Sequence, residues 1–154
     1  MVLVPAVLVR VSPATLVAAV LYGGVPMGWL DYRGGGVAAA AVVVEALADF
    51  QLGAFRSDPA NKGKVMDRGL WGWSRHPNYF FEWLCWCAYP VIAIDFGGFN
   101  PYAWFALLAP VCMYWLLTSG SGIPPLEQHM GRTRGDFYRA YQKRNNGFVP
   151  FPNA

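Results

Sequence analysis

Four stretches of this chain contain almost no charged residue, and this feature limits the fold more than any other. The first stretch has no Asp, Glu, Lys or Arg over 20 residues, the length of α-helix that crosses the roughly 30 Å apolar core of a bilayer. In the second stretch the only charged residues are Glu45 and Asp49, and in the third the only one is Glu82. The four stretches are Val11–Leu30, Val37–Phe55, Tyr79–Ile94 and Phe96–Leu126, the last centred on Tyr102–Leu117. We interpret them as four membrane-spanning helices.

The composition agrees with a membrane protein. Hydrophobic residues make up 55% of the 154 residues and charged residues 14%, against roughly 45–50% and 25% in soluble domains. The net charge of +3 does not indicate a nucleic-acid partner, and the expected partner is the lipid bilayer. The predicted fold is all-α, a polytopic membrane helix bundle with about four transmembrane helices. We divide it into an N-terminal membrane helix with a Gly-rich link (residues 1–36, the link being Asp31–Gly36) and a membrane domain (residues 37–154).

The basic residues predict the orientation of the bundle. Eleven of the 12 Lys and Arg residues fall before the first stretch, between the second and third, or after the fourth, and only Arg33 falls on the other side. The positive-inside rule therefore places both termini and the central loop, residues 56–75, in the cytoplasm. We expect a multi-pass protein of the endoplasmic reticulum membrane in a eukaryote, or of the inner membrane in a bacterium.

The C-terminal part changes character after Thr118. Ser119–Gly122 is expected to end the fourth helix, and Pro124 and Pro125 can open another, because proline is tolerated in a first helical turn. Leu126–Tyr141 carries Met130 and Phe137 among polar and basic residues, which predicts a cytoplasmic amphipathic helix.

Acidic side chains within membrane helices indicate a functional site by default, because burying them there is costly. Glu45 and Asp49 are four residues apart and share one helical face, and Glu82 lies about one turn into the third helix. These carboxylates either pair with loop arginines and fix the helix packing, or line a pocket for a polar, anionic cofactor with those arginines.

The central loop carries the strongest chemical signal. Arg68, Arg75 and His76 offer donors for phosphate or carboxylate groups. Tyr79 offers a ring face, and Asn78 is expected to be the N-cap of the third helix. The alternative interpretation is an interfacial loop with an aromatic belt. Two histidines and no spaced cysteine cluster make a metal site unexpected.

Several blocks together resemble one family. Arg68-Gly-Leu-Trp71, Ser74-Arg-His-Pro-Asn-Tyr79, Ser121-Gly-Ile-Pro-Pro-Leu-Glu127 and Phe148-Val-Pro-Phe-Pro152 are similar to the DUF1295 family, relatives of the steroid 5α-reductase C-terminal domain. The Arg-His-Pro-Asn-Tyr core is also similar to the loop of isoprenylcysteine carboxyl methyltransferases.

The resemblance implies a membrane oxidoreductase that binds NADPH from the cytoplasmic side and reduces a C=C bond of an enone-type lipid or steroid-like substrate. NADPH would supply the hydride, and the protein would supply orientation. In 5α-reductases the tyrosine and glutamate that address the substrate carbonyl come from N-terminal helices. Here one predicted helix precedes the recognisable region, so no catalytic residue is assigned, and a homo- or hetero-oligomer is allowed. The predicted cofactor-binding residues are Glu45, Asp49, Arg56, Arg68, Arg75, His76, Asn78, Tyr79, Glu82, Glu127, His129, Arg132 and Arg134.

Two alternatives stay open at this point. One is a membrane methyltransferase that uses S-adenosylmethionine, in which the Glu127 carboxylate would hold the amine or ribose of the cofactor. The other is a non-catalytic membrane subunit that keeps the fold.

Overall fold

The computed structural model describes residues 28–93 and 101–151, and within these ranges the fold is all-helical, as the sequence predicts. The predicted helix Val11–Leu30 lies almost wholly outside the described residues. The α-helices are α2 (Trp29–Ser57), α3 (Pro77–Ala93), α4 (Leu108–Thr118) and α5 (Ile123–Arg144), and the 3₁₀ helices are η1 (Pro59–Asn61), η2 (Gly69–Gly72) and η3 (Pro101–Leu107). The expected spans Val37–Phe55 and Tyr79–Ile94 fall on α2 and α3, and Tyr102–Leu117, the centre of the fourth expected span, falls on the run from η3 to α4.

The Gly-rich segment Asp31–Gly36 is part of α2, so its assignment as a link is wrong. Asp31 favours helix there, because its Oδ2 accepts a hydrogen bond from the backbone N–H of Gly28 at 2.7 Å, at the start of α2. Gly34 is required by packing, since a Cβ at this position would overlap the Ile92 side chain on α3. Close helix contact therefore outweighs the low helix propensity of glycine, about 1 kcal/mol per residue.

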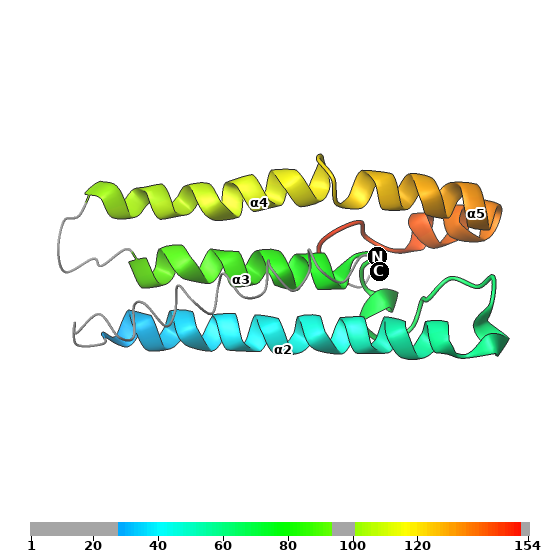
Figure 1. The fold of residues 1–154 in the computed structure, drawn as a ribbon, viewed down its shortest axis with the longest axis horizontal. Coiled ribbons are helices and arrows are strands. Elements are labelled where there is room, and N and C mark those ends of the chain that lie inside the picture. Colours follow the sequence, from blue (N-terminus) through cyan, green and yellow to red (C-terminus); the bar gives the residue numbers. More distant parts are fainter. Residues whose placement is uncertain (1–27, 94–100, 152–154) are drawn as a thin grey trace.

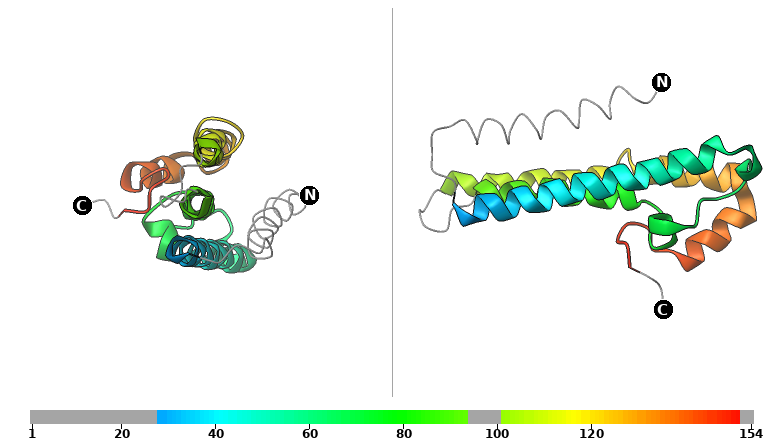
Figure 2. Two further views of the ribbon diagram at one scale, coloured as in Figure 1. Left: turned by 90° about the vertical axis from the view of Figure 1, so that its left-hand side faces the viewer. Right: turned by 90° about the horizontal axis from the view of Figure 1, so that it is seen from below.

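Helices α2, α3 and α4 lie side by side with α3 in the middle (Figures 1 and 2). The contact between α2 and α3 is close because small residues line it: Ala41 and Ala48 on α2 and Ala88 on α3 are almost fully buried. Large apolar side chains instead point outward, among them Phe50 on α2 and Val111 and Trp115 on α4, each more than 60% exposed. An outward apolar face is what a lipid-facing helix requires.

Two segments of the described chain are long and apolar enough to cross a membrane, Trp29–Ser57 and Trp104–Arg144. The 29 residues of α2 measure about 43 Å at 1.5 Å per residue, more than the roughly 30 Å apolar core of a bilayer. Helix α2 is therefore longer than such a core is thick, and its C-terminal end lies at the end of the molecule that carries α5 (Figure 1).

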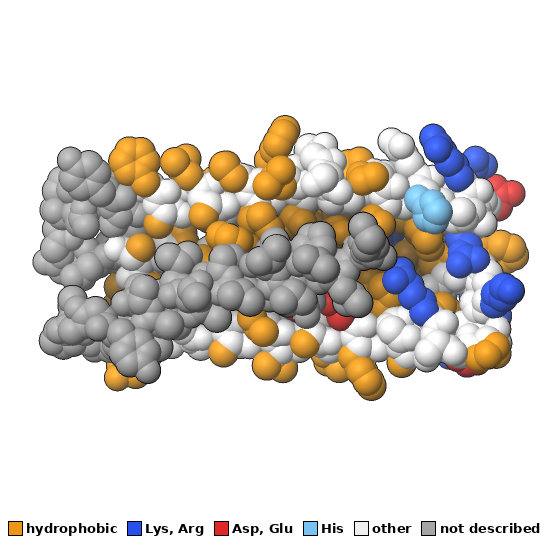
Figure 3. All heavy atoms as spheres, viewed as in Figure 1, with side chains coloured by type: hydrophobic (Ala, Val, Ile, Leu, Met, Phe, Trp, Pro, Cys, Tyr) orange, Lys and Arg blue, Asp and Glu red, His pale blue; other side chains and the backbone are white. Residues whose placement is uncertain are grey.

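Helix α5 is longer than the predicted Leu126–Tyr141 and turns back at Gly135, whose φ of 53° lies in the left-handed region. The break before it falls at Ser119–Gly122, as expected. Lys and Arg side chains gather at this end of the molecule, whereas the described side chains visible elsewhere on this face are mostly hydrophobic (Figure 3). After α5, the chain returns to α3 and α4, where the Phe148 ring packs against Phe80, Trp83 and Tyr114.

Candidate functional site

The loop between α2 and α3 is held against α2 by one buried and one partly buried hydrogen bond. The Trp71 Nε1–H donates to the backbone oxygen of Ala48 at 2.9 Å, and the backbone N–H of Leu70 donates to Gln51 Oε1 at 3.1 Å. Trp71 is buried, so its ring is part of the core, whereas Trp73 is half exposed. The loop is therefore a fixed surface that can present its basic residues in defined positions.

Arg75 joins this loop to α5 and to the C-terminal segment. Its Nε donates to Glu127 Oε1 at 2.7 Å, and its Nη1 donates to the backbone oxygens of Gln142 and Asn145, both at 2.9 Å. The backbone N–H of Arg75 donates to the Asn146 oxygen at 2.8 Å. Arg75, which the sequence assigns to cofactor binding, thus forms these hydrogen bonds with other parts of the protein.

His76 and Gln142 complete the same cluster, which we call the polar junction: Arg75, His76, Glu127 and Gln142. His76 Nε2 lies 3.3 Å from Glu127 Oε1, and Gln142 Nε2 donates to Glu127 Oε2 at 3.1 Å. The His76 ring also stacks on Tyr79, with 5.7 Å between ring centroids. Both carboxylate oxygens of Glu127 therefore accept hydrogen bonds from side chains of the protein.

Burial and charge set the ionisation of the polar junction. Burial lowers the pKa of His76, and the adjacent Glu127 carboxylate opposes this only in part. Burial alone would raise the pKa of Glu127, but the hydrogen bonds and charges of Arg75 and His76 outweigh it and lower that pKa. The junction thus contains a carboxylate and an arginine at neutral pH, with His76 biased towards its neutral form.

A second group of predicted residues lies between α2 and α3. Asn78 Nδ2 donates to Asp49 Oδ1 at 3.1 Å, with Glu45 one turn from Asp49 and Glu82 one turn from Asn78. The expectation that Asn78 is an N-cap is wrong, because α3 begins at Pro77. Proline takes the first helical position, where its missing N–H costs nothing, and this leaves the Asn78 amide for Asp49.

A cavity of about 270 Å³ opens beyond the end of this group, between α2, the loop and α5. Lys64 and Arg68 reach it from the loop and Arg144 from the end of α5, whereas Asp67 is its only acidic lining residue. Arg144 Nη2 lies 3.8 Å from Asp67 Oδ2. The lining residues are Phe55, Asn61, Gly63, Lys64, Val65, Asp67, Arg68, Phe137, Tyr141 and Arg144. We call this space the basic cavity.

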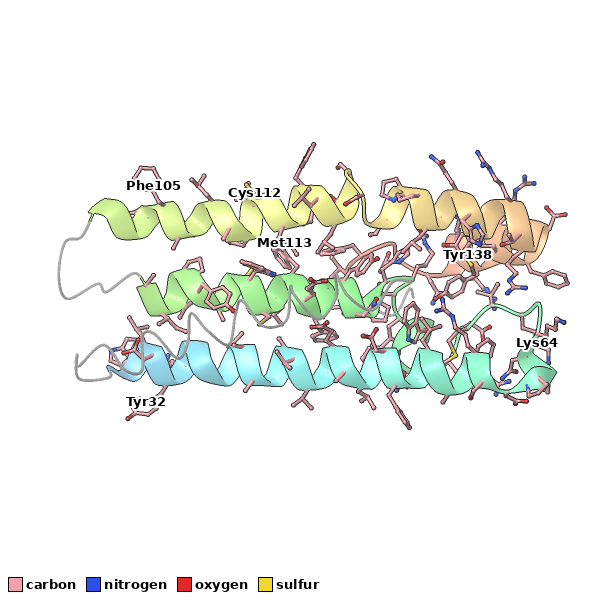
Figure 4. The ribbon with its side chains drawn as sticks, viewed as in Figure 1. Tyr32, Lys64, Phe105, Cys112, Met113 and Tyr138 are labelled. Carbon is pink, nitrogen blue, oxygen red and sulfur yellow. The ribbon has the colours of Figure 1, made fainter. Side chains whose placement is uncertain are left out.

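Arg134 lies at the edge of the basic cavity, with its Nη1 beside Gly63. Its Nε is buried and has no hydrogen-bond partner within the described residues. Buried donors are normally satisfied, so an anion in or beside the cavity would supply what this donor lacks. Figure 4 shows Lys64 from the loop and Tyr138 from α5 at this end of the molecule.

The predicted site residues therefore fall into separate places. Arg68 lines the basic cavity and Arg134 borders it, whereas Arg56, His129 and Arg132 are exposed and do not line it. Sequence reasoning missed two cationic residues that line the basic cavity, Lys64 and Arg144. Their only signal was a contribution to the basic side of the charge asymmetry. In the part of the chain that the structure describes, no group of three His, Cys, Asp or Glu residues could hold a metal ion.

Fold and site together define an all-helical protein with membrane-length helices and a basic cavity at one end. Comparison with protein families specifies the class further. The family described as "Protein of unknown function (DUF1295)" matches residues 2–145, so the chain belongs to the DUF1295 family. No curated protein and no solved structure matches it.

Proposed function

We propose that this protein is an integral membrane reductase that uses NADPH to reduce a C=C bond of an enone-type lipid. The observation that carries the proposal is the basic cavity, which Lys64, Arg68 and Arg144 line. The nearby Nε of Arg134 is buried and has no hydrogen-bond partner among the described residues. Guanidinium and ammonium groups in a partly enclosed space are typical of phosphate recognition. Phe55 and Phe137 add apolar walls of the kind that an adenosine group can contact.

The proposal includes a membrane orientation with four transmembrane helices and both termini in the cytoplasm. Residues 29–48 of α2 measure about 30 Å, and α3 has 17 residues, so both match the apolar core of a bilayer. Asp49 and its partner Asn78 then lie at the cytoplasmic boundary. At the opposite end of α2 the Arg33 guanidinium lies 4.5 Å from the Trp29 ring centroid, and such pairs suit the other interface. The fourth span, Val11–Leu30, is carried by the charge pattern.

The basic cavity and the Asp49–Asn78 pair can serve one extended cofactor. Asp49 and Phe55 are six positions apart on α2, about 9 Å along the helix, a distance that an extended dinucleotide is long enough to span. Lys64, Arg68 and Arg144 would hold its phosphates, and Asp49 and Asn78 would hydrogen-bond polar groups nearer the membrane. When bound, NADPH supplies the hydride.

Residues outside the two cofactor contacts hold the elements of the site in position. The polar junction fixes the loop that carries Arg68 to the helix that carries Arg144. Arg75, in that loop, donates hydrogen bonds to Glu127 and to the backbone oxygens of Gln142 and Asn145. Trp71 fixes the same loop to α2. The apolar surface of α2 and α4 leaves a lipophilic substrate free to approach from the bilayer rather than from water.

The structure gives less support to S-adenosylmethionine as cofactor. In that alternative the Glu127 carboxylate holds the cofactor amine or ribose, yet both of its oxygens accept hydrogen bonds from Arg75, His76 and Gln142. A cofactor amine would have to displace these partners, at a cost of about 1–3 kcal/mol for each buried group left unsatisfied.

A titration of the protein in detergent with NADPH, followed by nicotinamide fluorescence, tests the proposal. We expect saturable binding that weakens about tenfold or more in Arg68→Gln and in Arg144→Gln, because each removes a charge-assisted hydrogen bond of about 1.5–3 kcal/mol. The matched control is Arg139→Gln, which removes an exposed arginine that pairs with Asp136 at 3.1 Å and does not line the cavity. Absence of saturable binding, or an equal loss in the control, would contradict the proposal.

A further inference from the structure

The residues that follow α5 carry exposed apolar side chains to which the scheme above gives no role. We call residues 145–151 the C-terminal segment (red in Figure 1). In this segment Phe151 is 67% exposed and Val149 is also exposed. Trp73, the neighbour of the residue that pairs with Asn146, is half exposed. Exposed apolar side chains are common on protein surfaces, so the position of the segment along the helices decides what it faces.

The Phe148 ring fixes one point of the C-terminal segment along the axis of α3. This ring packs against Phe80 and Trp83 on α3 and against Tyr114 on α4, at 5.4–5.8 Å between ring centroids. Trp83 lies six positions after Pro77, the first residue of α3, which is about 9 Å along the helix. The Phe148 ring therefore lies deeper among the helices than the level at which α3 begins.

The rest of the segment stays at the level of that beginning. The backbone N–H of Arg75, two residues before α3, donates to the Asn146 oxygen at 2.8 Å. Asn146 Nδ2 donates to the backbone oxygen of Phe151 at 3.0 Å, so the chain returns to the same level there. The Ser74 hydroxyl donates to the backbone oxygen of Phe148 at 2.9 Å. The C-terminal segment is therefore a short loop held at the N-terminal end of α3.

This level is the cytoplasmic interface of the bilayer in the membrane orientation proposed above, in which α3 spans the apolar core. Aromatic side chains are favoured at such an interface, and an exposed phenylalanine gains free energy when it leaves water for the acyl boundary. Lys143, exposed in the last turn of α5, adds a cation that lipid phosphates attract. Tyr114, which contacts Phe148, is half exposed on the same helix as the outward-pointing Val111. The surface of the segment thus continues the lipid-facing surface of α4.

We propose that the C-terminal segment is an interfacial anchor, whose Val149 and Phe151 side chains insert into the cytoplasmic leaflet while Lys143 contacts lipid phosphates. The inference rests on the proposed membrane orientation and not on the proposed cofactor or reaction. The anchor also supports the loop before α3, because hydrogen bonds from Ser74 and Arg75 join that loop to the segment.

The first test measures the depth of Phe151 with a nitroxide spin label. Phe151→Cys, Phe137→Cys and Val111→Cys are each labelled in the full chain, after replacement of the native Cys85, Cys87 and Cys112 by alanine, and are placed in lipid nanodiscs. Collisions of the label with oxygen, which concentrates in lipid, are compared with collisions with a nickel chelate that stays in water. Phe137 is the matched control, since it is 80% exposed but lies at the turn of α5.

We expect an oxygen-to-nickel collision ratio at position 151 that is several-fold higher than at position 137. Faster collision with nickel at position 151 would overturn the inference. Protection of position 151 from both reagents would also overturn it, because a second copy or another protein would then cover the segment. Position 111 is expected to favour oxygen, and a water-exposed label there would overturn the proposed membrane orientation as well.

The second test keeps the native cysteines and compares Phe151→Asp with Phe151→Leu, which retains an apolar side chain. In nanodiscs of phosphatidylglycerol, Phe151→Asp is expected to lower the thermal midpoint by about 2–4 °C and Phe151→Leu to leave it unchanged. The loss is expected to be smaller in phosphatidylcholine, because anionic lipid repels the aspartate and a contact within the protein would not respond to lipid charge. Equal midpoints for the two variants, or an equal loss in the two lipids, would overturn the inference. Neither test contains NADPH, so failure of NADPH to bind would overturn the proposed cofactor alone.

Discussion

Replacement of Arg75 by alanine is expected to destabilise the protein by about 3–4 kcal/mol. The change removes the bond from Nε to Glu127 Oε1 at 2.7 Å and the two bonds from Nη1 to backbone oxygens at 2.9 Å. Hydrogen bonds that involve a charged group contribute about 1.5–3 kcal/mol each. The total is less than three times that value, because the Arg75 and Glu127 side chains are 16% and 20% exposed and water can reach the groups left behind.

The assay is equilibrium unfolding by SDS titration in mixed micelles, followed by tryptophan fluorescence and combined with NADPH titration of the folded protein. Arg75→Lys is the matched variant, because lysine keeps the charge but lacks the guanidinium geometry that reaches all three oxygens. We expect it to recover less than half of the lost stability. A double-mutant cycle with Glu127→Gln should give a coupling energy of about 1–2 kcal/mol.

A different outcome would refute the reasoning. If Arg75→Ala lost less than about 1 kcal/mol of stability while its NADPH affinity fell tenfold, Arg75 would act directly on the cofactor. The polar junction would then not be the element that joins the loop to α5, and the interpretation of this motif from sequence would be the better one.

Two further expectations concern helix packing and pH. Gly34→Leu should lower stability by about 1–3 kcal/mol because the leucine side chain would overlap Ile92. Gly35→Leu, with open space around its Cβ position, should be neutral or stabilising. Equal thermal midpoints for the two variants would contradict the close α2–α3 contact. The folded-state pKa of His76 lies below its ordinary value of 6.5, so the unfolded chain binds more protons below pH 6.5 and stability should fall as the pH is lowered from 7.5 to 5.5. His76→Asn should flatten that dependence in a series of thermal midpoints, and an unchanged slope would contradict the assignment. The lowered pKa of Glu127 adds a loss of the same sign below pH 4.5.

The charge pattern predicts much of the fold because burying a charge in lipid is costly whatever the tertiary structure. The spans expected at Val37–Phe55 and Tyr79–Ile94 are therefore helices. Prediction from helix propensity failed where contacts between helices determine the local structure. The glycines of Asp31–Gly36 favour a link by propensity, yet the contact between Gly34 and Ile92 keeps the segment helical.

The candidate site was predictable in chemistry but not in geometry. Arg75 and Glu127 were both singled out, but nothing in a sequence shows that a carboxylate 52 residues away is the partner of the guanidinium. Arg144 and Lys64 were overlooked for the converse reason. Basic residues near membrane helices are common for topological reasons alone, and only the turn of α5 at Gly135 brings Arg144 to the loop that carries Lys64.

The measurement that tests the central claim most directly is a competition titration of the unmodified protein in detergent. NADPH fluorescence is recorded as the protein is added, and S-adenosylmethionine is then added in excess. The account predicts saturable NADPH binding that S-adenosylmethionine does not reverse. It also predicts that this binding weakens as salt rises, because salt screens the attraction between the phosphates and Lys64, Arg68 and Arg144. Absence of NADPH binding, or displacement of NADPH by S-adenosylmethionine, would contradict it.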